Sequence, residues 1–114
     1  MNRFHIFGKA SEIEAVKYLK SKKYKIIEIN YFFLGGEIDI IAKFKNVYIF
    51  IEVKARTTLK FGYPQEAVNK KKQANIRKGA LHFFKQNRIF EYVARFDVIE
   101  ILNGQINHIE NAFD

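Results

Sequence analysis

The chain has 114 residues and a formal net charge of +8, with 48% hydrophobic residues and no cysteine. This length suits a single domain, 1–114, and the apolar content argues against wholesale disorder. The absence of cysteine excludes a disulfide framework and a thiolate metal site, and it is consistent with the cytoplasm, where we expect the protein. No apolar run reaches the roughly 18 residues of a membrane span, and the first ten residues lack a secretory core, so no membrane contact is expected.

The basic charge has two interpretations. With a pI near 9.7, the chain favours an anionic partner, which is most often nucleic acid. The alternative is that the lysines only keep the surface soluble.

The hydrophobic pattern predicts a helix, three strands, a second helix and two further strands. The first helix has Ile13, Val16 and Leu19 on one stripe and Ser11 as a candidate N-cap, and Gly79 is the weak point of the second helix. The predicted elements are a helix over 11–23, strands over 24–33, 37–44 and 47–56, a loop over 57–64, a helix over 66–86, and strands over 95–102 and 105–109. The order α-β-β-β-α-β-β indicates an α/β fold, with a mixed central β-sheet flanked by helices.

Charged residues interrupt two adjacent apolar strands, and alternation assigns them to one face of each strand. In the strand over 37–44 the charged face carries Glu37, Asp39 and Ile41, opposite Ile38, Ile40 and Ala42. In the strand over 47–56 it carries Tyr48, Phe50, Glu52, Lys54 and Arg56, opposite Ile49, Ile51, Val53 and Ala55. On the strand over 47–56 this face is aromatic at its start and charged at its end, so we expect it to be covered at one end and open at the other.

A tight turn at 45–46 would place Asp39 opposite Glu52, and Glu37 opposite Lys54. Facing carboxylates repel each other unless a cation lies between them. Mg²⁺ takes oxygen ligands, typically one or two carboxylates with water and substrate phosphate. A loop one residue longer or shorter would put the two carboxylates on opposite faces, so this prediction depends on the register.

Lys54 and Glu12 complete the candidate site. Lys54 lies two residues beyond Glu52 on the same face, where its ammonium group would neutralise a phosphate oxygen or orient an attacking water. Glu12 lies four residues before Val16, so it shares the inward stripe of the first helix and would reach the site as a third carboxylate. The alternative for Glu12 is a favourable interaction with the positive end of the helix dipole.

The chain resembles the PD-(D/E)XK nuclease superfamily in Glu12, in Gly36-Glu37-Ile38-Asp39 and in Phe50-Ile51-Glu52-Val53-Lys54-Ala55-Arg56. More closely, it resembles the YraN-like family of small bacterial proteins, which is similar in core fold to archaeal Holliday-junction resolvases. The resemblance covers nearly the whole chain and includes Asn30, Lys72-Gln73 and Arg95-Phe96-Asp97-Val98. It departs at Phe32, where relatives often carry a basic residue, and at Ser11, where a glycine is common.

The resemblance implies a restriction endonuclease-like fold and an endonuclease that hydrolyses DNA phosphodiester bonds with Mg²⁺ or Mn²⁺. Branched or junction DNA and nonspecific duplex are the candidate substrates. The resemblance implies Asp39, Glu52 and Glu12 as metal ligands and catalytic residues, with Lys54 as the catalytic lysine. Glu37 is interpreted as a structural partner of Lys54 or of a neighbouring arginine. Related resolvases cut two strands symmetrically as dimers, so a homodimer is expected.

A basic segment offers a DNA surface, because no acidic residue occurs from 67 to 90. Lys72 shares the helical stripe of Ile76 and Ala80, so it is expected to face the site. Phosphate contacts by this segment would weaken steeply with salt, whereas a solvated helix face is the alternative for any single lysine. The predicted nucleic-acid contacts are Arg56, Lys70, Lys71, Lys72, Gln73 and Arg77.

Two other hypotheses stay open. One is a catalytically inactive nucleic-acid-binding module with a nuclease fold, and the other is an interaction protein whose charged strands form only surface ion pairs. Facing carboxylates favour the enzyme, because a pure binder does not need them. His5, His82 and His108 lack metal-ligand spacing and are expected to be surface or packing residues.

Overall fold

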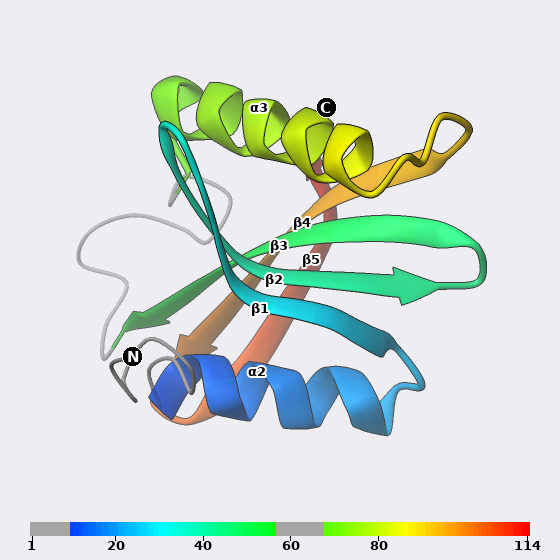
Figure 1. Ribbon diagram of the computed structural model, residues 1–114. Helices are drawn as coiled ribbons and strands as arrows, with labels where there is room; N and C mark the ends of the chain where they lie inside the picture. The colour runs from blue at the N-terminus through cyan, green and yellow to red at the C-terminus, as the bar shows by residue number, and fades with distance from the viewer. Residues whose placement is uncertain (1–9, 57–67) are drawn as a thin grey trace, which may run out of the picture.

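The computed structural model describes residues 10–56 and 68–114, in which a five-stranded sheet lies between two helices (Figure 1). The elements follow the predicted order: α2 (Ala10–Ser21), β1 (Lys25–Phe33), β2 (Gly36–Phe44), β3 (Val47–Arg56), α3 (Lys70–Gln86), β4 (Val93–Leu102) and β5 (Gln105–Phe113). The predicted mixed α/β fold is therefore confirmed. The predicted loop over 57–64 lies outside the described residues. Within the described ranges, neither helix has the length and apolarity to cross a membrane.

The sheet has the strand order β1-β2-β3-β4-β5. Among the described strands only β3 and β4 are parallel neighbours, and the chain between them contains α3. The turn at 45–46 sets the predicted antiparallel register, with Phe44 opposite Val47 and Ile41 opposite Phe50. Both turn residues have positive φ, as a two-residue hairpin turn requires.

Two apolar clusters occupy the two faces of the sheet. One packs Leu19 of α2 against Ile40, Ile49 and Ile51, and the other packs the buried side of α3 against Phe50. The buried residues on and beside α3 are those predicted from the sequence: Val68, Ile76, Ala80, Phe83 and Phe84. The predicted alternation of β3 is thus confirmed, with successive side chains packing under opposite helices.

The outer half of the β1–β2 hairpin bends toward α3 (Figure 1). Asn30 has a φ of 56°, and it lies between the hairpin pairs Ile29–Ile40 and Tyr31–Ile38. Beyond the bend Ile38 packs in the α3 cluster, whereas Ile40 packs under α2. The prediction that Ile38 and Ile40 share a face is therefore wrong, because the bend breaks the alternation.

The same bend opens the sheet between β2 and β3. Their pairing ends at Ile40–Ile51, one position before the predicted pair of Asp39 with Glu52. That pair and the predicted pair of Glu37 with Lys54 do not form, because β2 leaves β3 at this point. The diverging strand ends leave room for side chains from both faces of the sheet.

Gly79 permits the hairpin tip to pack on α3. A Cβ at this position would lie 2.5 Å from Cε1 of Phe33 and 2.8 Å from Cδ1 of Ile38. No side chain fits at such distances without displacing its neighbours. The glycine that weakens the predicted helix is therefore required by the contact that holds the bent hairpin.

Both helices differ slightly from prediction at their starts. Helix α2 begins at Ala10, so Ser11 lies within its first turn and the predicted N-cap is wrong. Ile13 is 41% exposed, because the buried stripe of α2 runs instead through Glu12, Ala15 and Leu19. Helix α3 begins at Lys70, and its N-cap Asn69 accepts a hydrogen bond from the Lys72 amide at 2.8 Å.

Candidate functional site

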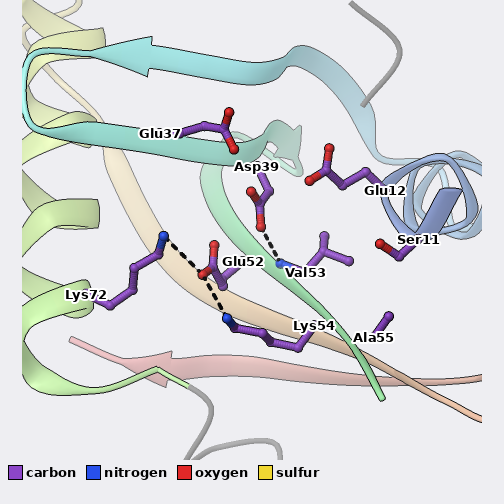
Figure 2. A pocket seen from close by; sticks show the side chains of 9 residues that line it. All are labelled: Ser11, Glu12, Glu37, Asp39, Glu52, Val53, Lys54, Ala55 and Lys72. Atoms are coloured by element: carbon purple, nitrogen blue, oxygen red, sulfur yellow. Dashed lines mark hydrogen bonds and ion pairs between the residues drawn. The ribbon is translucent and has the colours of Figure 1, made fainter. Parts of the chain in front are cut away.

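A pocket of about 340 Å³ lies where β2 and β3 diverge (Figure 2). It is lined by Ser11, Glu12, Glu37, Asp39, Glu52, Val53, Lys54, Ala55 and Lys72. These residues come from the first turns of α2 and α3 and from the diverging strands. The structure therefore brings together all four residues expected to be catalytic, Glu12, Asp39, Glu52 and Lys54, and it adds Glu37 and Lys72.

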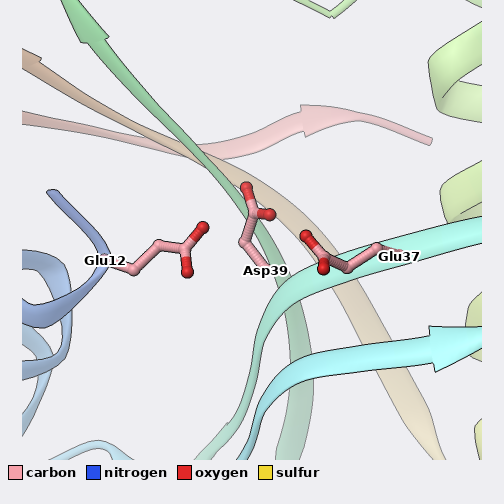
Figure 3. A group of neighbouring side chains, drawn as sticks. All are labelled: Glu12, Glu37 and Asp39. Atoms are coloured by element: carbon pink, nitrogen blue, oxygen red, sulfur yellow. The ribbon is translucent and has the colours of Figure 1, made fainter. Parts of the chain in front are cut away.

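Three carboxylates gather on the α2 side of the pocket (Figure 3). One oxygen from each of Glu12, Glu37 and Asp39 lies within 4.8 Å of the other two. Since Ile38 points toward α3, its neighbours Glu37 and Asp39 turn toward α2, where Glu12 is 4% exposed. The bend in the hairpin thus creates a concentration of negative charge.

Asp39 is anchored to the neighbouring strand. Its Oδ2 accepts a hydrogen bond from the backbone amide of Val53 at 2.8 Å. This bond satisfies a β3 amide beyond the last pair of the β2–β3 ladder, Ile40–Ile51. Asp39 is 8% exposed, so its carboxylate is both fixed and largely withdrawn from water.

Glu52 lies between the acidic cluster and two lysines. Its Oε2 lies 3.4 Å from Nζ of Lys72 and 3.8 Å from Nζ of Lys54. Its Oε1 is buried and has no hydrogen-bond partner among the described residues. Burial and the neighbouring Asp39 carboxylate raise the pKa of Glu52 to about 8, against the lowering effect of the two lysines. A buried carboxylate oxygen without a partner is costly, and a cation would remove that cost.

The predicted nucleic-acid contacts fall into two groups. Lys72 faces the pocket, as its helical stripe predicted, while Lys70 and Lys71 are exposed on the same first turn of α3. The others make bonds within the protein: Gln73 donates to the Val68 carbonyl, Arg77 to the Asp114 carbonyl, and Nε of Arg56 lies 3.2 Å from buried Glu100. DNA contact by any of the six stays a prediction.

Residues 11–101 match the model of the "Uncharacterised protein family UPF0102". The chain belongs to this family. It is 47% identical over 106 residues to a UPF0102 protein of Sulfurihydrogenibium sp. (strain YO3AOP1), covering 93% of this chain and 92% of that relative. It is 49% identical over 108 residues to one of Clostridioides difficile (strain 630), covering 93% and 95% of the two chains. Membership confirms the YraN-like family predicted from the sequence.

The UPF0102 match spans every residue of the pocket. Most of the charged residues of this pocket were predicted from the sequence, but Glu37 was interpreted as a structural partner of Lys54 or Arg56. The signal for its actual position is Asn30, since asparagine tolerates positive φ better than most residues. The bend at Asn30 depends on the packing of the hairpin against α3, and local sequence patterns do not reveal that contact.

A second polar network of this UPF0102 chain centres on Asp97, which is fully buried. Asp97 accepts two hydrogen bonds from Arg95, at 2.8 and 2.9 Å, and one from the Asn111 amide at 2.9 Å. Nε2 of His108 lies 2.7 Å from Oδ2 of Asp97, and Nδ1 of His108 lies 3.1 Å from the Tyr18 hydroxyl. The network ties α2 to β4 and β5, and none of its described residues lines the pocket. It gives Arg95 and Asp97 a structural role and accounts for His108 as a packing residue.

Proposed function

We propose that the protein is a divalent-cation-dependent endonuclease of the PD-(D/E)XK type that hydrolyses phosphodiester bonds in DNA. The observation that carries this proposal is the convergence of four carboxylates and two lysines in one pocket. Carboxylates attract a cation and lysines attract a phosphate, so their adjacency suits a site that handles a metal and a phosphodiester together.

The donor set fits Mg²⁺ or Mn²⁺. Its charged ligand atoms are carboxylate oxygens, the donors that hard cations take, and no histidine lines the pocket among the residues that the structure describes. The unpartnered Oε1 of Glu52 is a further oxygen for which a cation is the natural partner. A bound cation would stabilise charge on the phosphate and increase the acidity of the attacking water.

The residues of the chain would orient and neutralise the substrate. Asp39, held by the Val53 amide, provides an acceptor in a fixed direction. Lys54 and Lys72 have side chains 41% and 38% exposed, so their ammonium groups are open to a phosphodiester. Preorganised positive groups of this kind lower the barrier by meeting negative charge as it develops on the phosphate.

The exposed surface beside the pocket favours nucleic acid over a small phosphoester. Lys70 and Lys71 extend the positive charge of Lys72 along the first turn of α3, and the chain as a whole carries +8. Such a stripe contacts phosphates without reading bases, so we propose nonspecific or branched DNA as the substrate. A homodimer would present two such pockets to two strands.

The test is cleavage of linear, flapped and four-way-junction DNA with Mg²⁺ or Mn²⁺, using wild type, Asp39→Asn and Lys54→Ala. Exposed Glu91→Gln and Lys17→Ala are matched controls outside the pocket. We expect cleavage by wild type and both controls only. Activity that survives both pocket substitutions would indicate a contaminating nuclease. DNA binding without cleavage in either metal would favour the inactive binding module.

A further inference from the structure

We propose that Glu37 is a ligand of the divalent cation, in a site formed with Glu12 and Asp39 on the α2 side of the pocket. The adjoining α3 side, formed by Lys54 and Lys72, would bind the phosphate. This inference deepens the proposed function and rests on it for the identity of the anion. The cation site itself can be tested without DNA.

The spacing of the three carboxylates supports a shared cation. Their nearest oxygens lie within 4.8 Å of one another. Oxygens bound to one Mg²⁺ at about 2.1 Å are roughly 3 to 4 Å apart, so small side-chain rotations would close the site. Glu12 comes from α2, whereas Glu37 and Asp39 come from the part of β2 that lies beyond the bend, which explains why the strand pattern does not reveal the set.

The distribution of charge separates the two sides of the pocket. Both lysines pair with Glu52 through the same oxygen, Oε2. A cation is repelled by the ammonium groups and attracted by the opposite side, where Glu12, Glu37 and Asp39 gather (Figures 2 and 3). This polarity would hold a phosphodiester between a cation and the two lysines.

The buried oxygen of Glu52 is an independent sign of a missing positive partner. The residue is 3% exposed, and Oε1 has no hydrogen-bond partner in the described part of the chain. Figure 2 shows this carboxylate in the pocket, with one oxygen joined to both lysines by dashed lines and no such line from the other oxygen. Glu52 would therefore link the two sides, with one oxygen for each.

The experiment measures Mn²⁺ binding to the DNA-free protein by isothermal titration calorimetry and by the electron paramagnetic resonance signal of free Mn²⁺. We expect Glu37→Gln and Glu12→Gln each to weaken binding by tenfold or more. Glu14→Gln, an exposed substitution one half-turn from Glu12 on α2, should bind as wild type does. Wild-type Mn²⁺ affinity in Glu37→Gln would overturn the proposal.

A thermal-unfolding measurement separates ligation from a structural role. If Glu37 binds the cation, the melting temperature of Glu37→Gln should rise less on addition of Mn²⁺ to the EDTA-treated protein than that of wild type does. A lower melting temperature in EDTA, with an undiminished gain from Mn²⁺, would assign Glu37 a structural role instead.

The two proposals fail in different ways. Loss of Mn²⁺ binding in Glu37→Gln, with no DNA cleavage by wild type in any metal, would support the cation site and contradict the proposed nuclease activity. Metal-dependent cleavage by wild type, with unchanged Mn²⁺ affinity in Glu37→Gln, would support the nuclease activity and show that Glu37 is not a ligand of the cation.

Discussion

The carboxylate of Asp39 accepts a hydrogen bond from the backbone amide of Val53 at 2.8 Å, beyond the last paired position of β2 and β3. One side chain therefore does two things. It satisfies a strand amide that the diverging sheet no longer pairs, and it fixes a carboxylate in the pocket. This hydrogen bond therefore couples the position of a pocket carboxylate to the divergence of β2 and β3.

The two roles of Asp39 can be separated by substitution. Asp39→Asn keeps an acceptor for the Val53 amide but removes the charge, whereas Asp39→Ala leaves that buried amide without a partner. We expect the alanine variant to be less stable than the asparagine variant by about 1–3 kcal/mol, and both to lose Mn²⁺ binding. Urea unfolding in EDTA measures the difference, and equal stabilities would show that the hydrogen bond contributes nothing.

Glu52 should make the stability of the metal-free protein depend on pH. Its pKa of about 8 when folded exceeds its ordinary value of 4.5, so the folded state holds this proton more tightly than the unfolded chain does. The stabilisation is therefore full below about pH 4.5 and is lost as pH rises through 8. Charged groups around the pocket are Glu12 from α2, Glu37 and Asp39 from β2, Lys54 from β3 and Lys72 from α3.

Urea unfolding in EDTA between pH 5 and 8.5 measures this dependence. Wild type should lose stability as pH rises, and Glu52→Gln, which cannot ionise, should lose less. Parallel pH profiles for the two proteins would contradict the assignment. Glu91→Gln is the control for an exposed glutamate and should follow wild type.

Asp97 should stabilise the fold without affecting the pocket. Burial alone would raise its pKa, but hydrogen bonds from His108, Arg95 and the Asn111 amide hold that pKa below the ordinary value. Asp97→Asn removes a buried charge partner of Arg95, so we expect a loss of about 3 kcal/mol in urea unfolding. In wild type, the stabilisation that charged Asp97 provides should be lost as pH falls through its lowered pKa, in the acid range.

The pocket provides the internal control for this variant. Because the Asp97 network and the pocket share no residue, folded Asp97→Asn should bind Mn²⁺ as wild type does. A large loss of Mn²⁺ affinity in the folded variant would mean that the two regions are coupled.

Gly79→Ala should destabilise the protein although alanine is the better helix former. Propensity alone predicts a gain of up to about 1 kcal/mol. The added Cβ would instead contact the ends of the Phe33 and Ile38 side chains at distances that force these side chains to shift in the hairpin–α3 contact, at a cost of about 1–3 kcal/mol. Since the same hairpin carries Glu37 and Asp39, Mn²⁺ binding should weaken as well.

Ala74→Gly, an exposed change on the same helix, is the matched control. It should cost about 1 kcal/mol through propensity and leave Mn²⁺ affinity unchanged. A Gly79→Ala variant with wild-type stability and affinity would contradict the role of the close contact.

The parts of the fold that depend on local periodicity were predictable from the sequence. The turn at 45–46 set the register of β2 and β3, and the helical stripe through Ile76 and Ala80 turned Lys72 toward the pocket. The pairing of Asp39 with Glu52 was wrong, because strand alternation assumes a regular strand and cannot register the bend at Asn30. That bend is stabilised by a contact with α3, more than 40 residues away in the sequence.

The position of Glu37 was missed for the same reason. Its place beside Glu12 follows from the reversed orientation of residues 37–39, which in turn follows from the docking of Ile38 near Gly79. Buried Asp97 and Glu100 were also invisible to pattern reasoning, because their burial depends on partners in other elements.

Metal-dependent DNA cleavage by this pocket is tested by the rate of cleavage of a labelled four-way junction as a function of Mn²⁺ concentration, for wild type and Asp39→Asn. We expect a rate that rises with Mn²⁺ and saturates for wild type, is abolished by EDTA, and falls by a factor of about 100 or more in Asp39→Asn. Equal Mn²⁺-dependent rates for the two proteins, with Glu91→Gln as the preparation control, would contradict it.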